Sequence, residues 1–193
     1  MVSKIELRDL TVAVLALSLA FSQFNLSLLP STIVIIVLIF AFHELSHKFL
    51  AQRYGCFAEF RMWPLGVALA ILSSFTGIIF AAPGATYISP YCKRKGRREF
   101  AFSVAHLSKK EYGKISLAGP ATNIVVGSAA LALSTVFTSQ FISTLSQLSF
   151  FLAFFNLLPI PPLDGSKVLA WDKRIWALAL IISLAGLIFL TQA

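Results

Sequence analysis

His43-Glu44-Leu45-Ser46-His47 places two imidazoles and a carboxylate inside an apolar segment, residues 31–52, that is long enough to cross a lipid bilayer. In a helix the two histidines lie one turn apart on the same face, so both can bind one metal ion, and Glu44 lies beside them. Ionisable groups in such a segment are costly unless pairing or function compensates for them. The sequence therefore predicts a zinc site within the membrane.

The composition is that of a membrane protein. Hydrophobic residues make up 58% of the 193 residues and charged residues only 12%, and the mean hydropathy is +0.83. The 16 Lys and Arg against 8 Asp and Glu give a net charge of +8. Basic residues gather in the cytoplasmic loops of membrane proteins, and the dense basic run at residues 93–98 has no interleaved aromatic residues. This charge predicts contact with the lipid surface rather than with nucleic acid.

Several apolar runs approach the ~20 residues that cross a bilayer as a helix. Five of them are predicted spans: residues 10–29, 31–52, 115–137, 141–158 and 175–190. The first run is too long for a typical signal-peptide core and is interpreted as a retained span. The prediction is a polytopic α-helical protein of the cell membrane, with residues 1–193 forming a single domain.

A sixth apolar run, residues 65–82, is interrupted by proline and glycine and fits neither helical nor strand periodicity. If it does not cross, all the basic residues fall on one side, so charge favours this arrangement with a cytoplasmic N-terminus. Its aromatic and β-branched flanks predict a small membrane-associated β-sheet or re-entrant region within residues 56–107. His106 is expected on the sheet or surface, and Cys56 and Cys92 are expected as free thiols facing the cytosol.

A hydrolytic zinc site uses three protein ligands and leaves one position for water. Asp164 is the best candidate for the third ligand, because it follows three prolines between residues 159 and 162 that must break the preceding helix. An aspartate that merely caps a helix is the alternative. With spans two and four running in the same direction, His43, His47 and Asp164 all approach the cytoplasmic side.

The residues around this cluster suggest a hydrolytic reaction. Zinc would lower the pKa of its water towards ~7, and Glu44 would accept the proton as a peptide carbonyl is attacked. Asn123 and Asn156 are candidate hydrogen-bond partners of the substrate or of the oxyanion. For Asn123, simple packing is the alternative, because Gly119, Asn123 and Gly127 recur every four residues as a small-residue helix face.

Three motifs together resemble the site-2 protease family of intramembrane zinc metalloproteases. They are the His43–His47 stretch, Gly119-Pro120 with Asn123, and Asn156…Pro159…Leu163-Asp164-Gly165. The resemblance implies a three-span core with His43, His47 and Asp164 as ligands of one zinc ion, Glu44 as catalytic acid and base, and strands after the first motif. It also implies that the substrate is a transmembrane segment of a membrane-anchored protein, cleaved in regulated intramembrane proteolysis.

Two other classes stay open at this point. A ZIP-like zinc transporter also carries His and Glu in its spans, but it should have further ligands in a neighbouring span. Residues 10–29 and 175–190 contain no His, Asp or Glu. A catalytically inactive scaffold that binds membrane partners is the other class, and the intact Glu44 argues against it. Zinc content together with protease activity separates the three.

Overall fold

The computed structural model describes residues 2–77, 79–95 and 102–192. Along the chain the elements are α1 (Lys4–Phe21), α2 (Leu29–Ile36), the π-helical turn η1 (Val37–Ala41), α3 (Phe42–Arg53), β1 (Cys56–Met62), α4 (Pro64–Ser74), β2 (Gly84–Lys95), β3 (Phe102–His106), α5 (Lys109–Ser134), α6 (Gln140–Asn156), α7 (Asp164–Trp171) and α8 (Lys173–Gln192).

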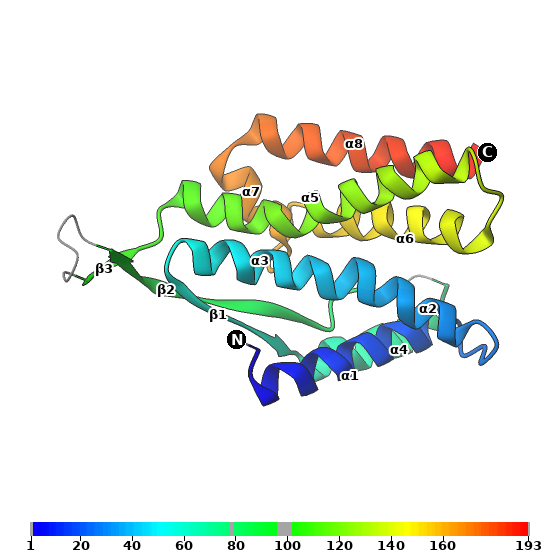
Figure 1. The fold of residues 1–193 in the computed structure, drawn as a ribbon, viewed down its shortest axis with the longest axis horizontal. Coiled ribbons are helices and arrows are strands. Elements are labelled where there is room, and N and C mark those ends of the chain that lie inside the picture. Colours follow the sequence, from blue (N-terminus) through cyan, green and yellow to red (C-terminus); the bar gives the residue numbers. More distant parts are fainter. Residues whose placement is uncertain (1, 78, 96–101, 193) are drawn as a thin grey trace.

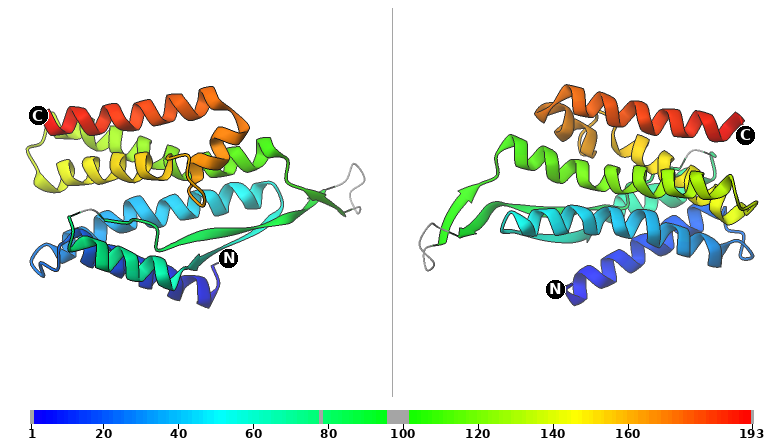
Figure 2. Two further views of the ribbon diagram at one scale, coloured as in Figure 1. Left: turned by 180° about the vertical axis from the view of Figure 1, so that it is seen from behind. Right: turned by 45° about the horizontal axis from the view of Figure 1, so that its top comes forward.

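The rod formed by α2, η1 and α3 lies in the middle of the molecule (Figure 1). Helices α5, α6, α7 and α8 cover one side of this rod, whereas α1, α4 and the sheet cover the other, as the views in Figure 2 also show. The largest buried cluster joins α1, the rod, β1 and α6 through residues such as Leu17, Ile36, Phe60 and Leu152. The rod that carries the histidine motif is therefore enclosed by both halves of the fold.

A single π-helical turn interrupts the central rod directly before His43. The N–H of Phe42 donates to the carbonyl oxygen of Val37, five residues earlier, although the backbone angles at both ends of the turn remain helical. Turns of this kind insert one residue into an α-helix and are frequent at functional sites. Ile36, before the turn, belongs to the large apolar cluster, whereas Glu44, after it, lines a pocket.

The segment at residues 65–82 leaves the sheet and returns to it. Met62 pairs with Gly84 in the antiparallel β1–β2 ladder, and the intervening helix α4 has only 11 residues. A helix of that length covers about 16 Å, roughly half of a hydrocarbon core. The described strands form one sheet in the order β1-β2-β3. The small sheet after the histidine motif is thus confirmed, and the geometry agrees with a re-entrant segment.

Three helical segments among the described residues are long and apolar enough to cross a membrane: Leu29–Arg53, Lys109–Ser134 and Lys173–Leu190. They correspond to three of the predicted spans. The predicted spans at residues 10–29 and 141–158 correspond to α1, whose first turns are charged, and to α6, which has 17 residues. The helical membrane fold is therefore supported, while a count of five spans stays a prediction.

The prediction of free thiols is wrong for Cys56, which is disulfide-bonded in the structure. The register of the sheet supplies the reason, because Cys56 lies directly opposite Cys92 in the β1–β2 pairing. The side chain of Cys92 lies outside the described part of the chain, as does much of the basic run at residues 93–98. His106 ends β3 and is exposed, as predicted.

Two carboxylates of α1 bind the outer edge of β1. Glu6 accepts a hydrogen bond from the backbone N–H of Phe60 (3.2 Å), and Asp9 accepts one from Met62 (3.4 Å). Glu6 is 1% exposed and also pairs with the buried ammonium group of Lys48 on α3. These contacts satisfy amide groups that an edge strand otherwise leaves open, and they join α1, the sheet and the histidine helix.

Glu6→Gln should lower the free energy of unfolding by about 3–5 kcal/mol, because it removes a carboxylate that is paired with the buried ammonium of Lys48. Thermal unfolding in detergent measures the effect. Glu111→Gln is the control, since Glu111 forms an exposed capping box with Ser108 in which glutamine can take the same place, so this change should matter by about 1 kcal/mol or less. Equal melting temperatures of the two variants would contradict the structural role of Glu6.

Candidate metal centre

Three potential metal ligands converge where α3 meets the start of α7. One ligand atom from each of His43, His47 and Asp164 can be chosen so that all lie within 4.8 Å of one another. The Oδ2 atom of Asp164 lies 3.3 Å from Nε2 of His43 and 3.0 Å from Nε2 of His47. All three residues are buried. The structure thus brings together three residues that are far apart in the sequence but were predicted to meet.

Asp164 is the first residue of α7, and its carboxylate does not cap that helix. The N-cap position belongs to Leu163, which makes no side-chain capping bond. Close approach of α7 to the end of α6 depends on Gly165, because a Cβ there would lie 2.0 Å from the carbonyl oxygen of Leu157. The carboxylate is therefore directed at the histidines and does not act as the N-cap of α7.

Each histidine is held by its other ring nitrogen. The Nδ1 atom of His47 lies 2.7 Å from the carbonyl oxygen of Ile115, to which it can donate, and this leaves Nε2 free to bind a metal. The Nδ1 atom of His43 lies 3.1 Å from the amide nitrogen of Asn123, whose own oxygen is buried without a hydrogen-bond partner among the described residues. Turning this amide over would let its oxygen accept from Nδ1 and free Nε2 as well.

Gly119 allows α5 to pass directly beside the histidines. A Cβ at this position would lie 2.4 Å from Nε2 of His47 and 2.5 Å from Nε2 of His43. The space that this glycine leaves open is therefore next to the metal-binding nitrogens. Together with the unpartnered oxygen of Asn123, it shows that the residues present fit a metal ion.

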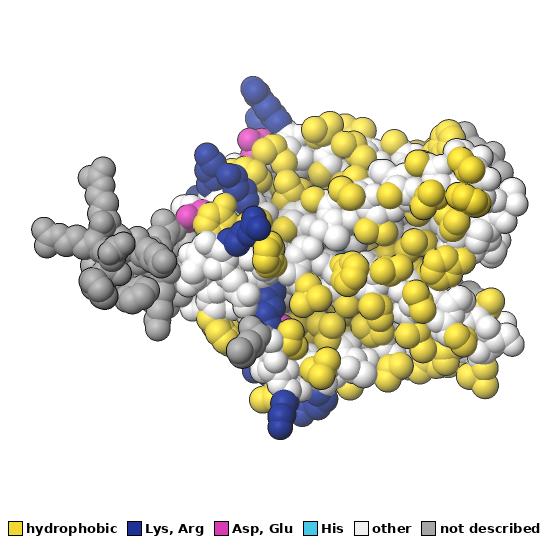
Figure 3. All heavy atoms as spheres, in the orientation of Figure 1, with side chains coloured by type: hydrophobic (Ala, Val, Ile, Leu, Met, Phe, Trp, Pro, Cys, Tyr) yellow, Lys and Arg dark blue, Asp and Glu magenta, His cyan; other side chains and the backbone are white. Residues whose placement is uncertain are grey.

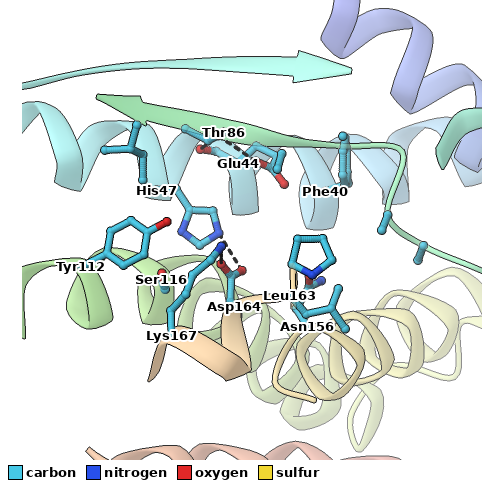
Figure 4. A pocket seen from close by; sticks show the side chains of 16 residues that line it. Phe40, Glu44, His47, Thr86, Tyr112, Ser116, Asn156, Leu163, Asp164 and Lys167 are labelled. Carbon is cyan, nitrogen blue, oxygen red and sulfur yellow. Dashed lines mark hydrogen bonds and ion pairs between the residues drawn. The ribbon is translucent and has the colours of Figure 1, made fainter. Parts of the chain in front are cut away.

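A pocket opens from this cluster towards strand β2 (Figure 4). Glu44 lies on one wall, and its Oε2 atom accepts a hydrogen bond of 2.8 Å from the hydroxyl of Thr86. On the opposite wall the Nζ atom of Lys167 lies 3.4 Å from Oδ1 of Asp164. The pocket therefore has the carboxylate of Glu44 on one wall and the ammonium group of Lys167 on the opposite wall.

The two asparagines of the sequence prediction have different positions. Asn156 lines the pocket, and its side-chain N–H donates to the carbonyl oxygen of Leu152 in its own helix. Asn123 is 0% exposed, contacts His43 and is not part of the pocket lining. Only Asn156 therefore lines the pocket, while Asn123 contacts the candidate ligand His43.

The Asp164 carboxyl, on a helix outside the three candidate spans, has a pKa below its ordinary value. Burial by itself would raise this pKa, but the two histidines and the ammonium group of Lys167, which lie against the carboxyl, outweigh it. The carboxyl is therefore ionised at neutral pH, as an oxygen ligand of a metal must be.

Sequence reasoning missed Thr86 and Lys167. Lys167 had a signal, because it follows Asp164 by three residues and so lies on the same face of a helix. Thr86 had none, because its position depends on the register of β2 against β1 and on the packing of the sheet beside α3.

A buried His-His-Asp cluster with an adjacent glutamate is typical of metal-dependent hydrolases. The model of Peptidase family M50 matches residues 132–175, which include Asn156 and Asp164. The relative named "Putative zinc metalloprotease MJ0611", from Methanocaldococcus jannaschii, is 40% identical over 184 residues, or 91% of this chain and 89% of that protein. "Putative zinc metalloprotease YwhC" from Bacillus subtilis is 28% identical over 164 residues, or 77% of this chain and 72% of that protein.

The chain belongs to peptidase family M50, and the resemblance to the site-2 proteases is thereby confirmed. No solved structure gives a significant match.

Gly119→Ala should abolish zinc binding, because the added methyl group would occupy the space beside both Nε2 atoms. Metal analysis of the purified variant should fall from about one zinc per chain to near zero. Gly127→Ala is the matched control on the same helix, since a Cβ there would lie 3.1 Å from the nearest side-chain atoms. Full zinc occupancy in Gly119→Ala, with normal helix content, would refute this placement of the metal.

Asn123→Ala and Asn156→Ala should separate support of a ligand from contact with substrate. Loss of the Asn123 amide should weaken zinc binding by about 10–100-fold, as measured by competition with a chelator. Asn156→Ala should leave the zinc affinity unchanged and lower the rate of peptide cleavage. The opposite pattern would show that the two asparagines have the reverse roles.

Proposed function

We propose that this chain is an intramembrane metalloprotease in which His43, His47 and Asp164 hold one zinc ion and Glu44 is the general base. The convergence of the three ligand atoms within 4.8 Å, inside an apolar helical fold, carries the proposal. Membership of peptidase family M50 supports it, and relatives bearing the name of zinc metalloproteases support the choice of metal.

A zinc ion at such a site supplies an acidified water and polarises a carbonyl oxygen. Glu44, which is 6% exposed and lies in the same pocket as His47 and Asp164, takes the proton of the attacking water and returns it to the leaving amine. Lys167 binds Oδ1 of Asp164 and so leaves Oδ2 for the metal. Asn156 is the pocket residue best placed to bind the substrate's carbonyl oxygen.

The proposed substrate is a transmembrane segment of a membrane-anchored protein that enters the pocket in extended form. One wall of the pocket is formed by the small residues Ala81, Ala82, Gly84 and Ala85. They leave room for another chain beside the metal ligands. Cleavage here would release the membrane-anchored protein, as in regulated intramembrane proteolysis.

The depth of the site follows from charge. Lys and Arg gather at one end of the visible face, while apolar side chains cover the remainder (Figure 3). His43 precedes Arg53, at the end of α3, by ten residues, or about 15 Å of helix. By the positive-inside rule the basic end is cytoplasmic. The proposed arrangement is a multi-pass protein of the cell membrane, a single domain with its N-terminus in the cytoplasm and its active site nearer that side.

Neither alternative from the sequence gains support from the structure. Within the described residues, the cluster of potential metal ligands is the one formed by His43, His47 and Asp164, and no second set marks a transport path. An inactive scaffold would not need Glu44 in the pocket of the ligands.

Glu44→Gln should keep one zinc per chain and lower peptide cleavage by about 10²–10⁴-fold, because the amide cannot accept the proton of the water. The assay uses detergent-solubilised protein and a set of single-span peptides with a fluorophore and a quencher on either side of the apolar segment. Asp164→Ala should lose both zinc and activity.

Three results would count against the proposed function. They are cleavage by Glu44→Gln at the normal rate, undiminished zinc in Asp164→Ala, and zinc-dependent ion flux without cleavage in vesicles that contain the wild-type protein.

A further inference from the structure

Strand β2 touches the proposed general base. The hydroxyl of Thr86 lies 2.8 Å from Oε2 of Glu44 and 3.1 Å from the backbone carbonyl oxygen of the same residue. Figure 4 shows the two side chains facing each other across the gap between β2 and α3. Both acceptors of the Thr86 hydroxyl belong to Glu44, one in its side chain and one in its backbone. The contact therefore fixes the carboxylate of Glu44 relative to the backbone of the same residue.

Strand β2, which supplies this hydroxyl, is held in place by its pairing with β1. Thr86 pairs with Phe60 in the β1–β2 ladder, and Phe60 is 1% exposed, packs edge-on against Phe40 and donates its backbone N–H to Glu6. Because Phe40 lies in η1, the turn that precedes α3, this ring contact packs the sheet against the central rod close to Glu44. The position of the hydroxyl is therefore set by packed elements.

We propose that Thr86 is a positioning residue that orients Glu44 for catalysis. By holding Oε2 it leaves Oε1 to take the proton of the water at the metal centre. The inference rests on the proposed role of Glu44 as general base. A hydrogen bond to a charged carboxylate is among the stronger polar contacts in a protein, and correct orientation of a catalytic group determines a large part of its effect.

The same strand also forms part of the pocket wall. Gly84, Ala85, Thr86 and Ile88 all line it. A peptide in the pocket therefore contacts the strand that holds the base, so the position of the bound chain and the orientation of Glu44 depend on one element. This juxtaposition explains why the chain places a threonine, rather than another apolar residue, at this point of an otherwise apolar wall.

The test compares variants of the full chain with the single-span peptide that the wild-type protein cleaves fastest. Thr86→Val keeps the side-chain shape but removes the hydroxyl, and it should lower kcat by about 10–100-fold with KM nearly unchanged. Thr86→Ser keeps a hydroxyl and should therefore keep most of kcat. Thr86→Ala removes the hydroxyl and has a smaller side chain than valine, and it should lower kcat as Thr86→Val does. Zinc content should stay at the wild-type value in all three.

Thr32→Val is the matched control. Thr32 is a buried threonine whose hydroxyl donates to the carbonyl oxygen of Leu28 within α2, away from the pocket. Its loss should leave kcat and KM at their wild-type values. A similar fall in kcat for this variant would show that any buried hydroxyl matters to the fold, and it would overturn the specific role of Thr86.

A second readout needs no substrate. With ¹³C in the side-chain carboxyls of glutamate, the NMR signal that disappears in Glu44→Gln identifies Glu44. This signal should shift in Thr86→Val and Thr86→Ala, stay close to its wild-type position in Thr86→Ser, and not move in Thr32→Val, because only the first two remove the donor.

The outcomes distinguish a failure of the proposed role of Thr86 from a failure of the proposed protease function. Normal kcat in Thr86→Val, a change in KM alone, failure of serine to restore kcat, or an unmoved Glu44 signal would each overturn the role of Thr86. If Glu44→Gln is inactive at the same time, the proposed function survives. If Glu44→Gln cleaves normally, the general base itself is wrongly assigned, whatever Thr86 does.

Discussion

The structure depends on the need to give every buried charge a partner inside an apolar protein. A lone carboxylate, imidazolium or ammonium group is very costly in such surroundings. Asp9 and Glu59 pair with Arg8 and Arg61, and two further groups of buried charges involve α3: the His-His-Asp cluster next to Glu44, and the pair of Glu6 with Lys48. The apolar packing surrounds these two clusters, and the elements that carry their members cannot shift independently.

Close backbone approach makes the first cluster geometrically feasible. Gly119 lets α5 pass beside the two imidazoles, and Gly165 lets α7 fold back against the end of α6. A side chain at either position would force the helices apart by more than a metal site tolerates. The inserted residue of the π-helical turn also helps to form this cluster, because it turns the histidine face of α3 towards α5 and α7. Small residues and one irregular turn thus build a polar centre in a helical bundle.

The sheet brings a second polar surface into the apolar region without exposing its amides. Its outer edge is covered by the carboxylates of α1, and its inner strand β2 lies along the pocket. Backbone groups at membrane depth are tolerated only where protein or a wet cavity satisfies them. At the outer edge of the sheet, Glu6 and Asp9 accept hydrogen bonds from backbone N–H groups of β1. On the other side the sheet faces the cavity that contains Glu44.

The sequence by itself determined the class of fold, the candidate metal-binding residues and the presence of a sheet. Helical spacing places His43 and His47 on one face, prolines end the helix before Asp164, and hydropathy marks the spans; each of these signals is local. Only the tertiary structure decided the disulfide of Cys56, the different positions of Asn123 and Asn156, and the contact of Thr86 with Glu44. These depend on strand register and on the rotation of packed helices, which arise from contacts between distant segments and leave no periodic trace in the chain.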